Sequence, residues 1–340
     1  MERLRLNPGK VPNEVLQGII FRHLGVKRKD VVLGPAIGED AAVVKVGENF
    51  LVTSIDPVTG ALEKVGWLAV NVSANDIATR GVRPLWFTSC ILLPERSTEN
   101  NVQKICNQID EAARELEIAV VSGHSEVTPG LTHPVVIGCM MGIAEDGHYV
   151  TSSGAKPGNK LILTKGVGVE GTAILASDRR SVLAKKLGKR LVKMAEGFFG
   201  KISVVEDALI AFRTGGATAM HDPTEGGIAG GLHELADASN TGFRIYENRI
   251  HVSSETEEIC RFFGIDPIQL ISSGSLLIAA RKDKVEIIME RLSKHSIAAS
   301  VIGDVTKPTS GRITISKTGK KKNLIRPVSD HLWVALAKSF

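Results

Sequence analysis

The segment KVGWLAVNVSANDIATRGVRPLWFTSCILL, residues 64–93, places a helical pattern directly before a strand pattern. In residues 64–80 the apolar side chains recur at the spacing of one helix face. Gly81 is suited to end this helix, and Leu85–Leu93 is an apolar run with the length of a buried strand. The segment therefore predicts a helix that packs on a sheet, with Asn75–Asp76 as polar residues late in that helix.

Similar patterns extend from this segment in both directions. In the first half of the chain, with Asn13 as a possible N-cap, we predict elements at Asn13–His23, Ala41–Val46, Leu51–Ile55, Asn100–Leu116, Ala119–Ser122 and Val135–Ala144. Turn-forming residues then cluster in Ser152–Asn159, which we interpret as a linker. Beyond it we predict elements at Lys160–Thr164, Glu170–Ser177, Val182–Glu196, Val204–Phe212, Gly227–Ala238, Ser275–Ala280 and Lys284–His295.

Helices and strands alternate along the chain, which is typical of an α/β protein. The 340 residues are about twice the usual length of one domain. We therefore predict an α/β (α+β) fold with an N-terminal domain at residues 1–150 and a C-terminal domain at residues 155–340.

The composition excludes several classes of protein. Hydrophobic residues make up 43% and charged residues 23%, which favours a folded chain over a disordered one. A net charge of +5 with only short basic runs does not indicate nucleic-acid binding. No apolar run is long enough to span a bilayer, and the four cysteines show no C-x-x-C pairing. We expect a cytoplasmic protein with reduced thiols, of which Cys90 and Cys139 are buried, and no nucleic-acid or membrane partner.

Acidic and glycine-bearing loops recur in the first domain, next to predicted strands and at the end of a predicted helix. The residues are Glu39, Asp40, Asp56, Asn75, Asp76, Gly123, His124 and Glu126. Carboxylates at such junctions can converge on one Mg²⁺, which prefers oxygen ligands and often bridges phosphates. Taken one at a time, each acid could instead cap a turn.

Two glycine loops of the second domain, Lys165–Gly171 and His221–Gly227, open predicted helices. Backbone N–H groups at such helix starts can face a phosphate, which the helix dipole favours. Neither loop matches the P-loop or G-x-G-x-x-G, so close packing of a helix on a strand is an equal alternative. The histidines show no zinc-ligand spacing, and no G-x-S-x-G elbow occurs, which argues against a zinc site and against a serine nucleophile.

Five motifs, in this order, resemble the aminoimidazole ribonucleotide (AIR) synthetase superfamily. They are Gly38-Glu-Asp-Ala-Ala-Val43, Asn75-Asp-Ile-Ala-Thr-Arg-Gly-Val-Arg-Pro84, Gly154-Ala-Lys-Pro-Gly158, Asp222-Pro-Thr-Glu-Gly-Gly227 and Ser273-Gly-Ser-Leu-Leu-Ile278. The superfamily includes thiamine-monophosphate kinase, selenophosphate synthetase and the hydrogenase-maturation protein HypE. The last two motifs are most similar to the HypE branch, and the resemblance covers about residues 12–315.

This resemblance implies a fold in which N-terminal strands form a β-barrel across a homodimer, with ATP in the cleft between the two domains. It implies that Asp40, Asp56 and Asp76 bind Mg²⁺. ATP would activate an oxygen of an amide, a carbonyl or a similar group on an unidentified small-molecule or protein substrate, and His124 or Glu126 would act on that substrate. The ATP-binding residues so implied are Asp40, Asp56, Asn75, Asp76, Gly123, Gly166, Gly168, Gly171, Asp222, Thr224, Gly226 and Gly227.

The sequence departs from the HypE pattern at two places. HypE ends in a Pro-Arg-Ile-Cys tail whose cysteine carries the group that is dehydrated, whereas residues 331–340 contain no cysteine. We therefore expect that this chain does not carry the reacting group on its own tail. His124 stands where relatives often have an acid, so either Glu126 takes the metal role, or His124 meets the substrate, or His124 only hydrogen-bonds its loop.

Two other functions stay open. A small-molecule kinase resembling thiamine-monophosphate kinase would leave a stable phosphorylated product, whereas an activating enzyme would release phosphate. A non-catalytic maturation or regulatory partner would bind the nucleotide without turning it over.

Overall fold

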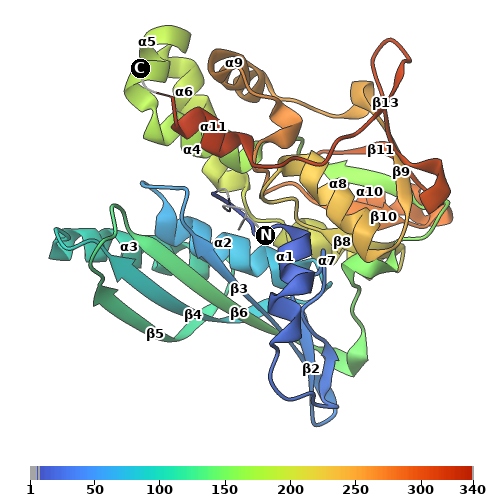
Figure 1. Cartoon of the computed structure of the whole chain (residues 1–340), viewed down its shortest axis with the longest axis horizontal. Coiled ribbons are helices and arrows are strands. Elements are labelled where there is room, and N and C mark those ends of the chain that lie inside the picture. Colours follow the sequence, from blue (N-terminus) through green and yellow to red (C-terminus); the bar gives the residue numbers. More distant parts are fainter. Residues whose placement is uncertain (1–5, 7, 339–340) are drawn as a thin grey trace.

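The computed structural model describes residues 6 and 8–338 and contains two sheets with helices packed against them (Figure 1). The first sheet is built from residues between Val31 and Ala144, and the second from residues between Lys160 and Asn323. The predicted two-part α/β architecture is therefore confirmed, while the limits 1–150 and 155–340 stay a prediction. Within the described residues, no helix combines the length and the apolar character that a bilayer span requires.

The first sheet has six strands in the order β1-β2-β3-β6-β4-β5. All neighbouring strands are antiparallel except β4 and β5, which run parallel. The strands are β1 (Val31–Leu33), β2 (Ala42–Val46), β3 (Asn49–Val58), β4 (Pro84–Leu93), β5 (Ala119–Val127) and β6 (Val135–Ala144). Helices α2 (Val65–Ala78) and α3 (Glu99–Glu115) cover one face of this sheet (Figure 1).

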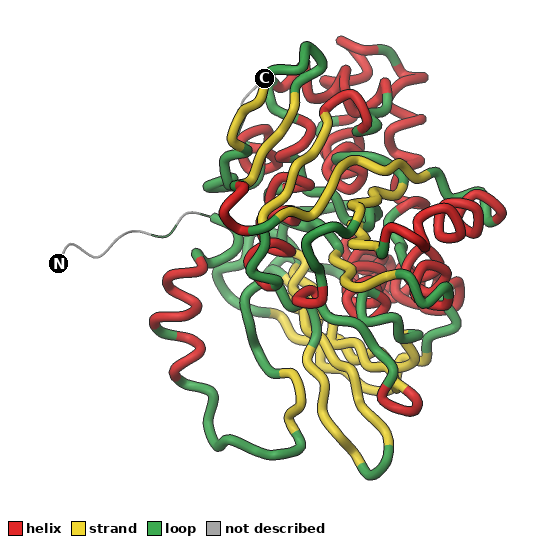
Figure 2. Tube along the Cα trace, turned by 90° about the vertical axis from the view of Figure 1, so that its right-hand side faces the viewer, coloured by secondary structure: helices red, strands yellow, loops and turns green. Residues whose placement is uncertain are grey.

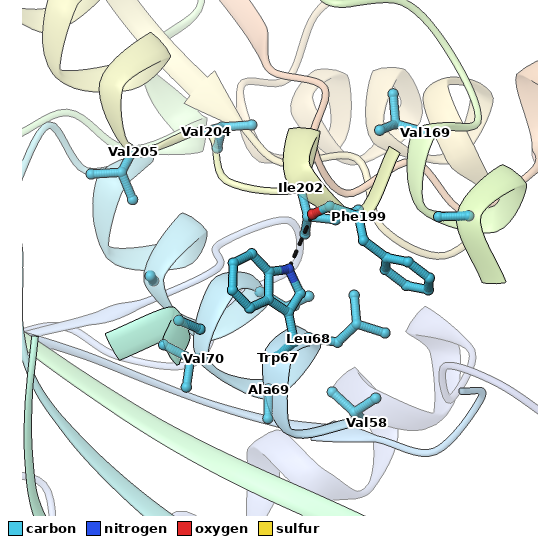
Figure 3. Close-up of a cluster of buried hydrophobic side chains, with 14 of the residues drawn as sticks. Val58, Trp67, Leu68, Ala69, Val70, Val169, Phe199, Ile202, Val204 and Val205 are labelled. Carbon is cyan, nitrogen blue, oxygen red and sulfur yellow. Dashed lines mark hydrogen bonds between the residues drawn. The ribbon is translucent and has the colours of Figure 1, made fainter. Parts of the chain in front are cut away.

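Helix α2 is buried along its whole length because it lies between the first sheet and the second domain. Figure 3 shows its Trp67 side chain reaching across, where the indole Nε1 donates a hydrogen bond of 3.0 Å to the carbonyl of Phe199. On its other side, α2 packs closely against strand β6. Gly138 on β6 permits this approach, because a Cβ there would lie 2.5 Å from Ser73 Oγ on α2. The helix predicted from the opening segment thus forms a core that both domains share.

The opposite face of the first sheet is largely uncovered. Side chains alternate between the two faces of a strand, so Ser54 on β3 is buried toward α2 while the neighbouring Ile55 is 68% exposed. Trp86 on β4 belongs to the same open face and is 37% exposed. Strand β5, at the edge of the sheet, is exposed at every residue. One copy of the chain therefore leaves an apolar sheet face in solvent.

The second sheet has seven strands in the order β13-β12-β9-β11-β7-β10-β8, antiparallel except for the pair β9 and β12. The strands are β7 (Lys160–Thr164), β8 (Ala217–His221), β9 (Gly242–Tyr246), β10 (Leu277–Ala280), β11 (Ala299–Thr306), β12 (Arg312–Ile315) and β13 (Lys321–Asn323). The helices of this half are α4 (Val169–Asp178), α5 (Arg180–Leu187), α6 (Lys189–Glu196), α7 (Val205–Arg213), α8 (Gly227–Ala238), α9 (Ser254–Phe263), α10 (Val285–Lys294) and α11 (His331–Leu336).

Two predicted strands are longer in the structure, and this changes where site residues lie. Strand β3 continues to Val58 and β5 continues to Val127, so Asp56 and His124 lie within strands rather than in loops that follow them. Both extensions are paired along their length, β3 with β6 and β5 with β4, so backbone hydrogen bonding outweighs the polar character of these residues.

Other differences are local. Gly188, at φ +93°, divides the predicted helix Val182–Glu196 into α5 and α6. The predicted N-terminal helix is reduced to α1 (Asn13–Gly18) and a following 3₁₀ turn, with Pro12 rather than Asn13 at the N-cap. No residue of α1 is buried, and Figure 2 shows it apart from both sheets. The predicted burial of Cys90 and Cys139 is wrong, because both are half-buried on the open sheet face.

Candidate functional site

A cavity of about 370 Å³ lies between the two domains. The end of β3 and the turn after it, residues 56–61, form one wall, and the first turn of α4 and the loop before α8 form another. Gly9 and Lys10 from the N-terminal segment and Trp333 from α11 complete the lining. Segments from both domains and both ends of the described chain therefore meet at this cavity.

Asp56 and Asp76 form a pair of carboxyl groups at the cavity. Asp56 lines the cavity from β3, and its carboxyl lies beside that of Asp76 on α2. Burial, reinforced by repulsion from Asp56, raises the pKa of Asp76 well above its ordinary value. Burial also raises the pKa of Asp56. A divalent cation would relieve this repulsion, so the pair is suited to hold one.

Asp40, the third predicted metal ligand, is bound by cationic side chains. Its Oδ2 lies 3.1 Å from Arg80 Nη2 and 2.9 Å from His221 Nδ1. Arg80 is fully buried and also pairs with Glu39, while His221 Nε2 lies 2.9 Å from Glu234 Oε2. Burial alone would lower the pKa of His221, but Asp40 and Glu234 raise it to about 10. A protonated His221 therefore links an acid of the first domain to one of the second.

Asn75 and Asp222 lie together beside the acidic pair. Asn75 Nδ2 donates to Asp222 Oδ2 at 3.0 Å and to the carbonyl of Ile202 at 2.9 Å, and its Oδ1 accepts from the Val204 N–H at 2.8 Å. Burial raises the pKa of Asp222 well above its ordinary value, and its Oδ1 has no hydrogen-bond partner within the described ranges 6 and 8–338. Of the predicted nucleotide-binding residues, these two are in direct contact across the domain boundary.

The first glycine loop opens α4, as predicted. Gly168, in the left-handed region at φ +65°, is the N-cap of this helix. The loop is packed against other segments rather than against open space: a Cβ at Gly166 would lie 2.8 Å from the His251 carbonyl oxygen, and one at Gly171 would lie 2.4 Å from Leu270 Cγ. Close packing of the helix therefore accounts for Gly166 and Gly171.

The second glycine loop opens α8 and reaches the cavity through Thr224. Gly226, at φ +78°, is the N-cap, and a Cβ at Gly227 would lie 2.5 Å from the carbonyl oxygen of Leu270. The Gly226 N–H, which could face a phosphate, donates instead to Asp330 Oδ2 at 2.6 Å. The chain's own carboxylate thus occupies a donor at this helix start.

His124 and Glu126 contact each other, with 3.1 Å between His124 Nε2 and Glu126 Oε2. Their side chains are 66% and 49% exposed. His124 is in register with Cys90 and Glu126 with Leu92, which places both on the open face of the sheet. Asp76 lies on the other face with α2, so a single copy of the chain does not bring His124 and Glu126 to the cavity.

Gly123 lies on the same cross-strand row as Asp56, because Asp56 pairs with Gly138, Gly138 with Ser89, and Ser89 with Gly123. The two residues are therefore three strands apart. At the usual spacing of neighbouring strands this separation is about 14 Å. A Cβ at Gly123 would lie 2.8 Å from the Ser89 carbonyl oxygen, so close contact between strands explains this glycine.

The donor set at the cavity fits Mg²⁺. Among residues 6 and 8–338, no group of three or more His, Cys, Asp or Glu side chains is arranged to hold a metal by itself. Mg²⁺ is commonly bound through one or two carboxylates and completes its octahedral shell with water and phosphate oxygens. Asp56 and Asp76 would supply those carboxylates, and the adjoining cavity has room for phosphate groups.

Sequence reasoning did not single out Glu170, Ser273, Asp330 or Trp333, although all four line the cavity. Glu170 and Ser273 belong to motifs in the sequence, and Trp333 belongs to the final amphipathic stretch. No spacing in the sequence relates these residues to the acids of the first domain. Only the packing of α4 and α11 brings them to one place.

Comparison with known proteins places this geometry in a family. The model of the AIR synthase related protein N-terminal domain matches residues 38–144, and that of the C-terminal domain matches residues 156–316. A putative hydrogenase expression/formation protein of Methanocaldococcus jannaschii is 28% identical, over 92% of this chain and 93% of that protein. Carbamoyl dehydratase HypE of Rhizobium leguminosarum bv. viciae is 30% identical, over 71% of this chain and 68% of that protein.

Solved structures show the same fold. A HypE–HypF complex contains a chain that superposes with a TM-score of 0.76 at 22% identity, covering 92% of this chain and 99% of that one. HypE in complex with ATP superposes with a TM-score of 0.68 at 20% identity, covering 95% of this chain and 96% of that one. The chain therefore belongs to the AIR synthase related protein family, within its HypE-like branch.

Proposed function

We propose that this protein is a Mg²⁺-dependent enzyme that uses ATP to activate an oxygen of an amide, a carbonyl or a similar group. The observation that carries the proposal is a carboxyl pair at an interdomain cavity, in which half-buried Asp56 lines the cavity wall and buried Asp76 lies beside it. Relatives named carbamoyl dehydratase and a neighbouring structure solved with ATP support it.

In this proposal Asp56 and Asp76 hold the Mg²⁺, which neutralises charge on the phosphoryl group being transferred. Asp40 adds negative charge nearby while Arg80 and His221 fix its position. Asn75 holds Asp222 at the domain boundary, so that both domains keep one geometry around the cavity. Lys10, which also lines the cavity, supplies a positive charge on the side of Asp56.

We also propose that the protein is a homodimer. The open face of the first sheet is apolar, and the outer edge of strand β5 is paired with no other strand in the described part of the chain. Such a face and edge are normally covered by another chain. A catalytic role for His124 or Glu126 depends on this dimer, because within one copy they lie across the sheet from the cavity. The four free thiols are consistent with a cytoplasmic location.

The test is Mg²⁺-dependent ATP turnover by the full chain against a panel of amides, carbonyl compounds and phosphorylated metabolites. Asp76→Asn should lower turnover at least about 100-fold, because it removes one of the two metal-holding carboxylates. Asp178→Asn is the matched control: burial also raises the pKa of Asp178, but this residue does not line the cavity. Undiminished turnover by Asp76→Asn would show that Asp56 and Asp76 are not the Mg²⁺ ligands.

Product analysis separates the remaining functions. Phosphorus NMR that shows released phosphate supports activation, whereas a stable phosphorylated product identifies a small-molecule kinase. Tight ATP binding without ADP formation across the whole panel identifies a non-catalytic nucleotide-binding partner.

A further inference from the structure

Three buried polar atoms around the cavity have no hydrogen-bond partner among the residues that the structure describes: Glu170 Oε2, Ser273 Oγ and Trp333 Nε1. Glu170 is 4% exposed and Ser273 is fully buried. Burying a polar atom without a partner is unfavourable, and folded proteins rarely do so without a functional reason. That three such atoms line one cavity indicates that a bound molecule supplies their partners.

The serines next to Ser273 have hydrogen-bond partners of their own. Ser272 and Ser275, on either side of Ser273, are hydrogen-bonded to each other at 2.8 Å, and Ser272 also accepts from the Gly168 N–H at 2.9 Å. The Ser273 hydroxyl lies beside Glu170, yet neither Ser273 Oγ nor Glu170 Oε2 is in hydrogen-bonding geometry with a partner. Both atoms are therefore available to a ligand.

Trp333 is held firmly in place by the segment that carries it. Asp330 accepts hydrogen bonds from the N–H groups of Gly226 and Ile271, at 2.6 and 3.2 Å. His331 Nδ1 accepts from the Asp266 N–H at 2.8 Å. Helix α11 therefore fixes the Trp333 indole at the cavity wall. By contrast, the indole of Trp67 has a backbone partner, which shows that this protein satisfies an indole N–H where no ligand is needed.

The chemistry of the three atoms defines what binds. An indole N–H only donates, so Trp333 requires an acceptor, while a carboxylate accepts and a hydroxyl does either. At this part of the cavity an anion is disfavoured, because Glu225 and Asp330 lie near Glu170. The rest of the lining is largely apolar, which suits a flat group. The apolar residues are Pro57, Val58, Ala61, Val72, Ile174, Ile271 and Leu332.

We propose that Glu170, Ser273 and Trp333 bind a planar, neutral group that presents an N–H donor beside an acceptor. A primary carboxamide and the Watson–Crick edge of adenine share this pattern. The site rests on the proposed function, because it would hold either the nucleotide base or the amide of the substrate. Burial raises the pKa of Glu170 to about 7, so near neutral pH its carboxyl is available to accept or to donate.

The experiment measures ligand affinity calorimetrically with the full chain and Mg²⁺. The probes are AMP-PNP, GMP-PNP, and acetamide added to protein saturated with AMP-PNP. The variants are Trp333→Phe, which removes the N–H together with part of the indole ring, Glu170→Gln and Ser273→Ala. The controls are Trp86→Phe on the open sheet face and Glu255→Gln, a buried glutamate in the first turn of another helix.

If the site holds adenine, wild-type protein prefers AMP-PNP to GMP-PNP, and each site variant weakens AMP-PNP binding about five- to tenfold. If it holds the carboxamide, the same variants weaken acetamide binding by that factor and leave AMP-PNP binding unchanged. Either result supports the site and identifies its occupant. Control variants should stay within about twofold of wild type for both probes.

Two outcomes would refute the proposed binding site. One of them leaves the proposed function intact, and the other refutes it too. If wild type binds AMP-PNP and the site variants bind both probes as tightly as wild type, the site is wrong and the proposed function stands. If wild type binds none of the probes, the proposed function fails together with the site. Thermal unfolding of each variant identifies any that fail to fold. If one variant fails to fold, the other two still test the site.

Discussion

Replacement of His221 by glutamine should remove most of the alkaline sensitivity of this protein. His221 is 1% exposed, and its two ring nitrogens lie 2.9 Å from Asp40 and 2.9 Å from Glu234. These carboxylates raise the pKa of His221 from 6.5 to about 10 in the folded protein. The folded state therefore binds one more proton than the unfolded state in the interval between these pKa values.

The sign and the size follow from proton linkage. A raised pKa stabilises the folded protein fully below about pH 6.5, and this contribution is lost as the pH rises through the folded pKa near 10. Between pH 7 and pH 9 the free energy of unfolding should fall by about 2.5 kcal/mol from this group alone. Glu170 and Asp330, whose raised pKa values are both about 7, each add about 0.4 kcal/mol to the fall in this interval.

Urea unfolding at pH 7 and pH 9 measures the effect directly. Wild type and the surface control His295→Gln should both lose about 3 kcal/mol between these pH values. His221→Gln should be less stable at pH 7, because Asp40 and Glu234 each lose one cationic partner, and should lose only about 1 kcal/mol between pH 7 and pH 9. A wild-type stability that is the same at both pH values would refute the proposed charge of His221. A His221→Gln variant whose stability depends on pH as strongly as that of wild type would refute it as well.

Three further substitutions test the fold and the assembly. Trp67→Phe should lower the free energy of unfolding by about 1 kcal/mol, because it removes the hydrogen bond to Phe199 between the domains; an unchanged urea midpoint would contradict this. Gly138→Ala should cost about 1–3 kcal/mol, because its Cβ would lie 2.5 Å from Ser73 Oγ, and a thermal midpoint equal to wild type would refute the close packing of α2. Ile55→Asp should convert the proposed dimer to a monomer in light scattering with unchanged far-UV circular dichroism, whereas a monomeric wild type would show that the homodimer is wrong.

Much of the fold follows from local patterns. The predicted strands Val135–Ala144 and Lys160–Thr164 and the helix Gly227–Ala238 have the limits found in the structure. Their apolar runs or periodicity are bounded by turn-forming residues, so local signals suffice. Several strands of the second sheet were not predicted, among them β8 (Ala217–His221) and β12 (Arg312–Ile315). These are short, and their stability comes from pairing with strands that are distant in the sequence.

The candidate site was predictable only in part. Asp56, Asp76 and Asp222 stand out as acids at the ends of apolar elements, and the structure brings them to one place. The sequence could not indicate that Asp40 is engaged by Arg80 and His221, because these contacts join separate elements. His124 was predicted in a strand-end loop, and the continuation of β5 places it on the open face instead.

The sequence by itself determined the family, the two-part α/β architecture and the buried helix α2, because motif order and hydrophobic periodicity are properties of contiguous residues. Only the tertiary structure decided which polar groups face one another. The cavity takes Asp56 from one domain, Glu170 from the other and Trp333 from the final helix. Such a site is set by how the sheets and helices pack, and the distances between side chains from separate elements are not encoded in any one segment.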